Sequence, residues 1–467
     1  MPSYARLFAA VSALATAANA VHPVEVRGKD FVNSETGDRF QILGVDYQPG
    51  GSGGFSGKAD PLTDRDACLR DAALMQRLGV NTVRIYNMSP NLDHDDCMSI
   101  FNAAGIYLIF DVNSPLEGGY LDRTNPKRTY NEVYFQQVFG IIEAFKDYPN
   151  TLGFFAGNEV INEQSVKDVP AYVRAVVRDM KDYISKNANR SIPVGYSAAD
   201  IRPWLTDTVN YFMCEDEDSP SSKSDFFGLN SYSWCGQSSF TKSGYDVLTE
   251  DFSNATLPVF FSEYGCNEVT PRVFTEVEAL YGEQMSKSFS GGLIYEFTQE
   301  TNEYGLVQLN DNDTATLLVD YDNLMKQYSK LDMSTIQATN ETATSLKPPK
   351  CGPGLIQNST FLDTFDLPKR PSKVQDYIDD GFVGKVHKGS LKEVKSQDIS
   401  QTIYDHNGKE VTGIRLNALS NDATNTPGNS SSSSSGSGSS SDDESAAGRL
   451  SVSLLGLVAG TAFMVML

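Results

Sequence analysis

The chain has 467 residues, 40% of them hydrophobic and 10% aromatic, which is enough for one large domain or two to three ordinary ones. Its formal net charge is -22 at pH 7, and its sequence pI is near 4.6. So acidic a surface repels phosphate, which argues against a nucleic-acid partner and against a polybasic membrane patch. A neutral substrate is compatible with it.

Both ends of the chain have the patterns of processing signals. Residues 1–20 combine Arg6, an apolar stretch and an A-x-A pattern, which predicts a secretory signal peptide. Residues 421–445 predict a disordered Ser/Gly-rich linker, and residues 446–467 contain a terminal apolar tail with no basic residue after it. This order is typical of a GPI-attachment signal, with attachment expected within Gly438–Ser441 and removal of the tail. A tail-anchored membrane helix is the alternative.

From about residue 40 to residue 300 one pattern recurs: an amphipathic helix, a Gly or Pro, an apolar run and a polar residue. In residues 62–86, apolar side chains fall at helical spacing, Gly79 ends the helix and a strand follows. Residues 97–112 and 132–159 repeat the pattern. The strands predicted in this way are Phe40–Val45, Thr82–Tyr86, Tyr107–Phe110, Leu152–Ala156, Ile192–Tyr196, Phe226–Leu229, Val259–Phe261 and Gly292–Tyr295.

Strands that alternate with helices predict a parallel sheet, and eight such units in about 260 residues fit an α/β fold, the (β/α)8 TIM barrel. We expect this catalytic barrel to span residues 21–335. A doubly wound sheet is the alternative, but no Gly-x-Gly-x-x-Gly turn follows the first strand. Residues 336–420 contain short apolar runs and predict a small appendage that packs on the barrel and is tethered through Cys351.

The six cysteines of a secreted chain predict disulfides, and six cysteines allow 15 pairings, among which the spacing alone does not choose. Seven N-x-S/T sequons agree with the secretory route. Asn87 directly follows a strand end, where a glycan would crowd a cleft, so we expect it to be unmodified. The glycosylation sites that we predict are Asn189, Asn254, Asn312, Asn340 and Asn358.

Polar residues follow the apolar strands, and in this fold chemistry is located at the carboxyl ends of the strands. The apolar run Phe154–Ala156 is followed closely by Asn158 and Glu159. A buried ionised carboxylate costs several kcal/mol unless it is paired, so Glu159 indicates an opening at the barrel mouth and a chemical role. A chance run of polar strand ends would provide no second carboxylate, but Glu263 follows the seventh strand.

Two carboxylates across a barrel mouth predict glycoside chemistry, in which one protonates the leaving oxygen and the other attacks the anomeric carbon. We expect Asn158 to form a hydrogen bond with a sugar 2-OH. We expect Tyr232 to orient Glu263 and keep it ionised, and Glu296 to have a supporting role beside them. The chain shows no metal-ligand spacing, serine elbow or phosphate loop, so we expect no metal and no cofactor. The tyrosines expected to stack on pyranose rings are Tyr47, Tyr86, Tyr120, Tyr295 and Tyr304.

These residues carry a resemblance to a known family. The Asn-Glu after the fourth strand and the Glu after the seventh resemble those of the retaining (β/α)8 glycosidases. Six segments narrow the resemblance to one family of these enzymes: GVDYQPGG, VRIYN, AGNEV, NSYSWCG, SEYGC and GLIYEF. From about residue 22 to the region of Cys351, the chain resembles the fungal GPI-anchored 1,3-β-glucanosyltransferases of glycoside hydrolase family 72. No cysteine follows Cys351, so the cysteine-rich carbohydrate-binding module of some members is expected to be absent.

The resemblance implies that Glu159 is the acid/base and Glu263 the nucleophile. It also implies the disulfide pairs Cys68–Cys97, Cys214–Cys351 and Cys235–Cys266. The glucan groove that it implies is lined by Gln48, Tyr86, Asp111, Asn158, Tyr232 and Tyr295, with Tyr304 as an extension.

The activity that the resemblance implies is transglycosylation. An internal β-1,3-glucan linkage is cleaved, and the new reducing end joins the non-reducing end of another glucan. The expected partners are donor and acceptor β-1,3-glucan chains, without a nucleotide sugar, and the expected location is the outer face of the plasma membrane through a GPI anchor, or the cell wall. An endo-1,3-β-glucanase is the first alternative, and a non-catalytic glucan-binding wall protein is a remote one.

Overall fold

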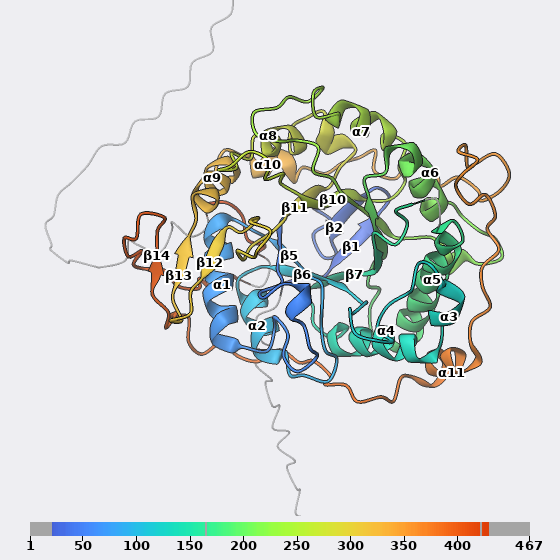
Figure 1. Cartoon of the computed structure of the whole chain (residues 1–467), viewed down its shortest axis with the longest axis horizontal. Coiled ribbons are helices and arrows are strands. Elements are labelled where there is room, and N and C mark those ends of the chain that lie inside the picture. Colours follow the sequence, from blue (N-terminus) through green and yellow to red (C-terminus); the bar gives the residue numbers. More distant parts are fainter. Residues whose placement is uncertain (1–20, 164–165, 421–422, 429–467) are drawn as a thin grey trace, which may run out of the picture. The chain divides into compact units, whose positions relative to one another are not determined.

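A computed structural model describes residues 21–163, 166–420 and 423–428 of the chain (Figure 1). The predicted signal peptide (residues 1–20), most of the linker and the predicted attachment signal lie outside the described residues. Within the described part, no helix has the length and apolar character needed to cross a bilayer.

Eight parallel strands close into a barrel in chain order, which confirms the predicted TIM-barrel fold (Figure 1). Each predicted strand overlaps an observed one, although Phe40 lies in the short strand that precedes the barrel. The barrel strands are β4 (Ile42–Asp46), β5 (Thr82–Ile85), β6 (Tyr107–Asp111), β7 (Thr151–Asn158), β8 (Val194–Ala199), β9 (Phe226–Asn230), β10 (Val259–Tyr264) and β11 (Gly291–Ile294).

Helices surround the barrel (Figure 1). The first begins where the Asp64 side chain accepts bonds from two backbone N–H groups, and it ends at Gly79, whose φ of 88° suits a residue without a side chain. The helices are α1 (Arg65–Leu78), α2 (Asp95–Ala103), α3 (Pro126–Thr129), α4 (Glu132–Phe145), α5 (Val169–Asn187), α6 (Arg202–Met213), α7 (Tyr245–Asp251), α8 (Glu276–Leu280), α9 (Val319–Tyr328), α10 (Met333–Ile336) and α11 (Ser372–Asp380), with short 3-10 turns at Ser52–Gly54, Pro220–Ser222 and Met285–Lys287.

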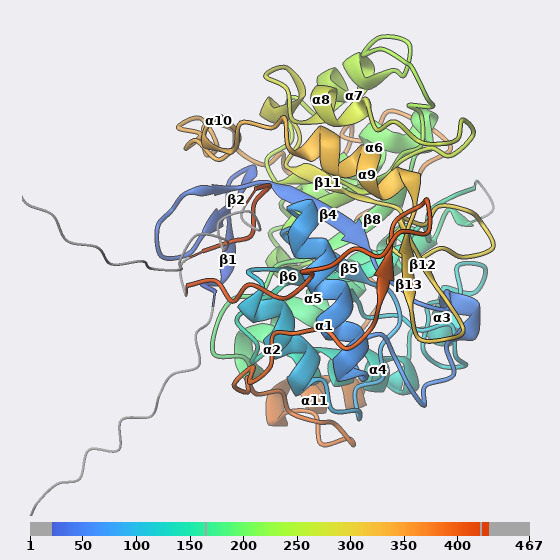
Figure 2. The ribbon, with the colours of Figure 1, turned by 90° about the vertical axis from the view of Figure 1, so that its left-hand side faces the viewer.

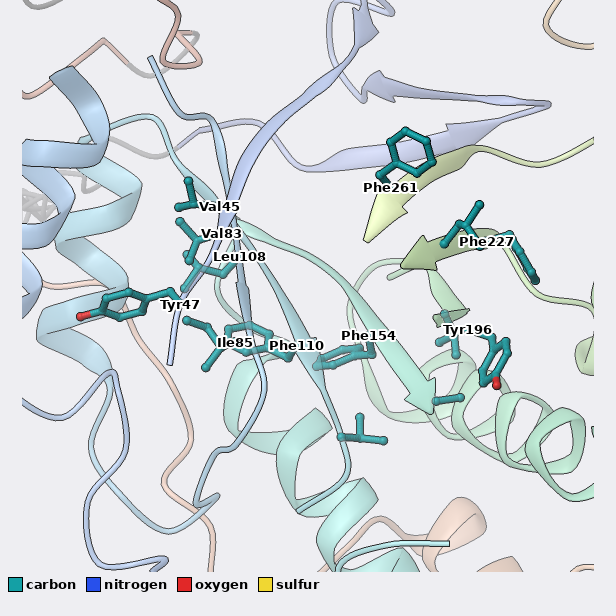
Figure 3. Packing of buried hydrophobic residues seen from close by; sticks show 14 of the residues in the cluster. Val45, Tyr47, Val83, Ile85, Leu108, Phe110, Phe154, Tyr196, Phe227 and Phe261 are labelled. Atoms are coloured by element: carbon teal, nitrogen blue, oxygen red, sulfur yellow. The ribbon is translucent and has the colours of Figure 1, made fainter. Parts of the chain in front are cut away.

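Two hydrophobic clusters hold the strands. The outward-facing side chains of the strands, such as Val83 and Phe154, pack beneath the helices in the larger cluster (Figure 3). The smaller cluster closes the amino ends of the strands, where Phe31 packs 5.8 Å from Phe260, ring centroid to ring centroid. Phe31 belongs to an antiparallel sheet of β1 (Val24–Arg27), β2 (Asp30–Asn33) and β3 (Arg39–Phe40). With this end filled, the carboxyl ends of the strands are left for a site.

The chain after α10 follows the outside of the barrel (Figure 2). Helix α11 packs against α5 and α4, and β14 (Ile403–Tyr404) joins a small sheet with β12 (Val307–Leu309) and β13 (Ala315–Leu317). The buried side chains of the chain after α10 belong to the larger cluster of the barrel; Phe361, Val374 and Leu416 are among them. In the described residues this segment therefore shares the core of the barrel.

Candidate active site

Both predicted catalytic glutamates follow an irregularity in their strand. The pairing of β7 with β8 shifts between Phe155 and Asn158, and that of β10 with β9 shifts between Phe261 and Glu263. Such bulges change which way the next side chain points and are frequent beside active sites. Glu159 also has a φ of 50°, which is uncommon for a residue other than glycine. The backbone thus directs both side chains at the mouth of the barrel.

Glu263 is 9% exposed, and three groups donate to its carboxylate. The hydroxyl of Tyr86 donates to Oε1 at 2.9 Å, and that of Tyr232 donates to Oε2 at 2.8 Å. Arg84 also donates to Oε1, at 3.3 Å. Both oxygens are therefore held in place, and each keeps lone-pair capacity toward the mouth of the barrel.

The pKa of Glu263 is set by opposing influences. Burial raises the pKa, the guanidinium of Arg84 lowers it, and the negative charge of Glu159 raises it again, while the two tyrosine hydroxyls lower it. The net pKa is above the usual range for a glutamate. The tyrosines themselves stay protonated, because burial raises the pKa of both Tyr86 and Tyr232. They act as donors to the carboxylate, and these bonds favour its charged form.

Arg84 and Asp111 form the floor beneath Glu263. Arg84 is fully buried, and it donates to both carboxylate oxygens of Asp111, at 2.8 and 3.2 Å, and to the carbonyl oxygen of Ser262. Its guanidinium also lies 4.4 Å above the ring of Tyr86. Asp111 is 4% exposed and engaged in this ion pair, so the structure places it under the groove instead of along its wall.

Asn230 links the surroundings of the two glutamates. Its amide nitrogen donates to Oε1 of Glu159 at 3.0 Å and to the side-chain oxygen of Asn158 at 3.1 Å. Its amide oxygen accepts a bond from the hydroxyl of Ser262 at 2.8 Å, and the hydroxyl of Ser197 donates to Asn158. The oxygen of Asn158 therefore faces the protein, which leaves its amide nitrogen for a ligand hydroxyl.

A cleft of about 520 Å³ opens beside Glu263. One wall is the glycine-rich turn after β4, in which the N–H of Gly50 donates to Glu300 at 2.8 Å. Four tyrosines from the segments that follow β5, β9 and β11 make edge contacts with one another, with centroids 5.2 to 6.4 Å apart: Tyr86, Tyr232, Tyr295 and Tyr304. The cleft is lined by Gln48, Gly50, Gly51, Ser52, Gly53, Gly54, Tyr86, Asn158, Glu263, Tyr295, Glu296, Glu300, Thr301 and Asn302. Loops with a mixture of amides, carboxylates and aromatic rings suit a polyhydroxylated ligand.

Two further carboxyl groups lie near Glu263, of which Glu296 lines the cleft and Asp46 does not. Glu296 is 2% exposed, accepts a bond from Asn302 at 2.9 Å, and has a pKa raised to about 7, mainly by burial. Asp46, at the end of β4, is completely buried, and burial raises its pKa well above the usual range. The position of Glu296 beside Glu263 fits the expectation that Glu296 supports the site.

One aromatic prediction is wrong. Tyr47 is 1% exposed and donates its hydroxyl to Asp71 of α1, so it cannot stack on a sugar in the cleft. Tyr120 is 43% exposed but is not among the residues that line the cleft. Asn87, at 5% exposed, donates to the hydroxyl of Ser52, and this geometry agrees with the expectation of no glycan there.

The three disulfides predicted from the resemblance are confirmed: Cys68–Cys97, Cys214–Cys351 and Cys235–Cys266. The last of these joins the loops that follow β9 and β10, beside Tyr232 and Glu263. Among the described residues, neither cluster with metal-ligand geometry contains a residue of the cleft lining.

Sequence reasoning assigned no role to four further residues that hold the two glutamates or their neighbours. Arg84, Ser197, Asn230 and Ser262 point into the barrel, although the strands that carry them are otherwise apolar. A polar residue at an inward position of a buried strand was the available signal.

Comparison with known proteins agrees with this geometry. A family model described as glucanosyltransferase, glycoside hydrolase family 72, matches residues 13–332. The chain is 71% identical over 472 residues to the 1,3-beta-glucanosyltransferase gel2 of Aspergillus fumigatus, with 99% of each chain covered. It is 44% identical to the 1,3-beta-glucanosyltransferase GAS4 of Saccharomyces cerevisiae, with 84% of this chain and 83% of the relative covered.

Solved structures give the same result. Saccharomyces cerevisiae Gas2p in complex with laminaripentaose matches with a TM-score of 0.69 and 39% identity, over 76% of this chain and 78% of that one. A Gas2p mutant in complex with laminaritetraose and laminaripentaose matches with a TM-score of 0.66 and 38% identity, over 76% of each chain. With the paired glutamates, the tyrosine-lined cleft and the family model in agreement, this chain belongs to the glucanosyltransferases of glycoside hydrolase family 72.

Proposed function

We propose that this chain is a retaining 1,3-β-glucanosyltransferase that elongates cell-wall β-1,3-glucan. The observation that carries the proposal is the arrangement of the two glutamates: one is held by Asn230, and the other is held by Arg84 and two tyrosine hydroxyls. The names of the relatives and the laminari-oligosaccharides bound to Gas2p support the choice of substrate.

In the first half of the reaction, Glu263 attacks the anomeric carbon of an internal β-1,3 linkage. Glu159 gives its proton to the departing oxygen, and the reducing-end fragment leaves while a covalent glucosyl ester forms on Glu263. In the second half, Glu159 takes the proton from the 3-OH of the non-reducing end of another glucan. That oxygen displaces Glu263, and the new bond is again β-1,3.

The surrounding residues have distinct roles in these steps. Tyr86, Tyr232 and Arg84 keep Glu263 ionised for attack, because each donates to the carboxylate. Asn230 holds Glu159, and Asn158 offers its amide nitrogen to the hydroxyl next to the reacting carbon. Tyr295, Tyr304 and Gln48 are proposed to bind the neighbouring glucose units, and Asp111 acts through Arg84 instead of contacting the sugar.

The test of the reaction class is product length. The secreted form, ending before the Ser-rich tail, is incubated with a reduced laminari-oligosaccharide of about a dozen units, and the products are sized by mass spectrometry. Products longer than the starting chain are expected. Shorter products alone would mean that water is the acceptor, and the chain would then be an endo-1,3-β-glucanase.

The test of the catalytic pair is substitution. Glu159→Gln and Glu263→Gln are each expected to abolish turnover while the melting temperature stays near that of the parent. Glu163→Gln, an exposed glutamate on the loop after β7, is the matched control and should retain full activity. Substantial turnover by either catalytic variant would contradict the assignment.

We also propose that residues 1–20 direct secretion and that a GPI anchor within Gly438–Ser441 holds the enzyme at the outer face of the plasma membrane or in the wall. Release from membranes by a phosphatidylinositol-specific phospholipase is expected, and a chain that ends before residue 446 should be secreted instead. Retention of that shorter chain on membranes would contradict the proposal. The predicted glycosylation sites, Asn189, Asn254, Asn312, Asn340 and Asn358, stay predictions until glycopeptides are mapped.

A further inference from the structure

The carboxyl group of Asp46 is buried inside the barrel. Strand β4 ends at this residue, and in the parallel pairing with β5 it lies opposite Arg84, so that both side chains point into the barrel. The bonds of Arg84 go instead to Asp111, to the carbonyl of Ser262 and to Glu263. Neither carboxyl oxygen of Asp46, which is 0% exposed, has a hydrogen-bond partner among the described residues.

An ionised carboxylate in this position is unfavourable. A charge taken out of water costs several kcal/mol unless hydrogen bonds or an opposite charge replace the water. The positive charge of Arg84 is already matched by the bidentate pair with Asp111. Burial raises the pKa of Asp46 most; the positive charge of Arg84 and the nearby hydroxyl of Tyr86 lower it, the charges of Glu263 and Glu296 raise it, and the net pKa lies well above the usual range.

Several titratable groups face Asp46 from the neighbouring strands. A negative charge on Asp46 would lie beside the carboxylate that must itself be negative to attack the sugar. A neutral Asp46 removes this repulsion and offers an O–H donor. The groups that interact with Asp46 are Arg84 from β5, Tyr86 directly after that strand, Tyr232 from the loop after β9, Glu263 from β10, and Tyr295 and Glu296 directly after β11.

The Tyr86 hydroxyl is suited to accept a hydrogen bond from the O–H group of a neutral Asp46. Tyr86 interacts with Asp46, and its own proton is directed to Oε1 of Glu263 at 2.9 Å. A phenol oxygen that donates one hydrogen bond still has lone pairs to accept another. Hydrogen bonds in a chain polarise one another, so a donor to Tyr86 strengthens the bond that Tyr86 makes to Glu263.

We propose that Asp46 carries a proton in the working enzyme and is a positioning residue for the nucleophile, donating to the hydroxyl of Tyr86, which in turn donates to Glu263. The proposal rests on the proposed role of Glu263 as nucleophile. It does not depend on whether sugar or water accepts the glucosyl group. Asp46 touches neither the sugar nor the reacting atoms, and it acts through Tyr86.

The test measures formation of the glucosyl ester, which needs no acceptor. The wild type, Asp46→Asn and Asp46→Ala are inactivated with a 2-fluoro laminaribiosyl fluoride across the acidic pH range. Asp46→Asn keeps a neutral donor, so its rate should stay within about threefold and the pH midpoint within about 0.3 units. Asp46→Ala lacks the donor, so the rate should fall roughly 3- to 10-fold and the midpoint should rise.

Two results would overturn the proposal. A midpoint that falls by about one unit or more in Asp46→Asn would mean that the wild-type Asp46 is ionised. Equal profiles for Asp46→Asn and Asp46→Ala would mean that Asp46 does not act on Glu263. Failure of all three proteins to form the ester would instead count against the nucleophile assignment, which separates the two proposals.

A second measurement needs no substrate and serves if Asp46→Ala does not fold. The infrared spectrum of the wild type minus that of Asp46→Asn is recorded at about pH 8, above the pKa of about 7 of both Glu276 and Glu296. A carbonyl stretch of a protonated carboxylic acid should appear in this difference. A carboxylate band in its place would overturn the proposal.

Discussion

Tyr232→Phe removes a hydroxyl that donates to Glu263, the proposed nucleophile, and leaves the aromatic ring of residue 232 in place. That hydroxyl donates to Oε2 of Glu263 at 2.8 Å, while the ring contacts Tyr295 and Tyr304 with centroids 6.3 and 5.6 Å away. The rings alone should keep the side chain at its position, so the variant isolates the hydrogen bond.

The size of the effect follows from the charge on the acceptor. A hydrogen bond to a charged group contributes about 1.5 to 3 kcal/mol, and one pKa unit corresponds to about 1.4 kcal/mol. Burial already raises the pKa of Glu263, and the Tyr232 hydroxyl opposes that rise. Its loss should therefore raise the pKa of Glu263 by a further one to two units, about 1.4 kcal/mol each.

The assay is the pH dependence of kcat/KM with a laminari-oligosaccharide. Glu263 must be ionised to attack, so activity is lost as the pH falls through its pKa, and the acidic limb should move to higher pH by about one to two units. Tyr404→Phe, the same change on β14 outside the cleft lining, should leave the limb unmoved. A shift below about 0.3 units in Tyr232→Phe would refute the assigned role of the hydroxyl.

Three further predictions concern the support of the site and the stability of the fold. Asn230→Ala should lower kcat/KM roughly 100-fold, because it removes the amide that holds Glu159, the proposed acid/base. The fall in kcat/KM should be much smaller on a substrate whose leaving group needs no protonation. Equal falls on both substrates would argue against positioning of the acid by Asn230. Replacing both Cys235 and Cys266 with serine opens a 31-residue loop, which should lower the free energy of unfolding in urea by about 3 to 4 kcal/mol and should also lower activity. Replacing Cys68 and Cys97 opens the 29-residue loop between α1 and α2, which should lower stability by a similar amount and leave activity unchanged. Burial raises the pKa of Glu276 from 4.5 to about 7, so its stabilising effect is complete below the lower value and is lost as the pH rises to the upper one. Glu276→Gln should therefore gain about 3 kcal/mol at neutral to alkaline pH and nothing in acid, whereas the exposed Glu278→Gln should follow the wild type at every pH.

The error at Tyr47 has a clear physical cause. Residues next to each other in a strand point to opposite faces, so a side chain that follows an inward residue points outward. Asp46 points into the barrel opposite Arg84, and Tyr47 therefore points at α1, where it meets Asp71. The sequence shows that aromatic and polar residues gather at the strand end. Whether each of these side chains points into the barrel or toward the helices depends on where the alternation of the strand stops.

The order of the eight strands, the end of the barrel that holds the candidate site and the two glutamates at that end could all be predicted from the sequence alone. These follow from local rules: apolar runs, helical spacing and glycine stops are properties of neighbouring residues, and parallel strands expose their carboxyl ends together. The position of each glutamate after its strand was enough to predict a catalytic role for it.

The contacts that hold the two glutamates could not be predicted in this way, because they form between strands of the folded barrel. The register shifts before Glu159 and Glu263 arise from pairing with the neighbouring strand of the barrel, which a helix separates from it in the chain. Likewise, Asn230 donates to Glu159 and accepts from Ser262, the residue before Glu263. Arg84 donates to Asp111, Glu263 and the carbonyl of Ser262, and none of its hydrogen bonds among the described residues goes to Asp46. Hydrogen bonds are directional and short, so which polar groups are satisfied is settled only when the barrel closes and brings the strand ends together.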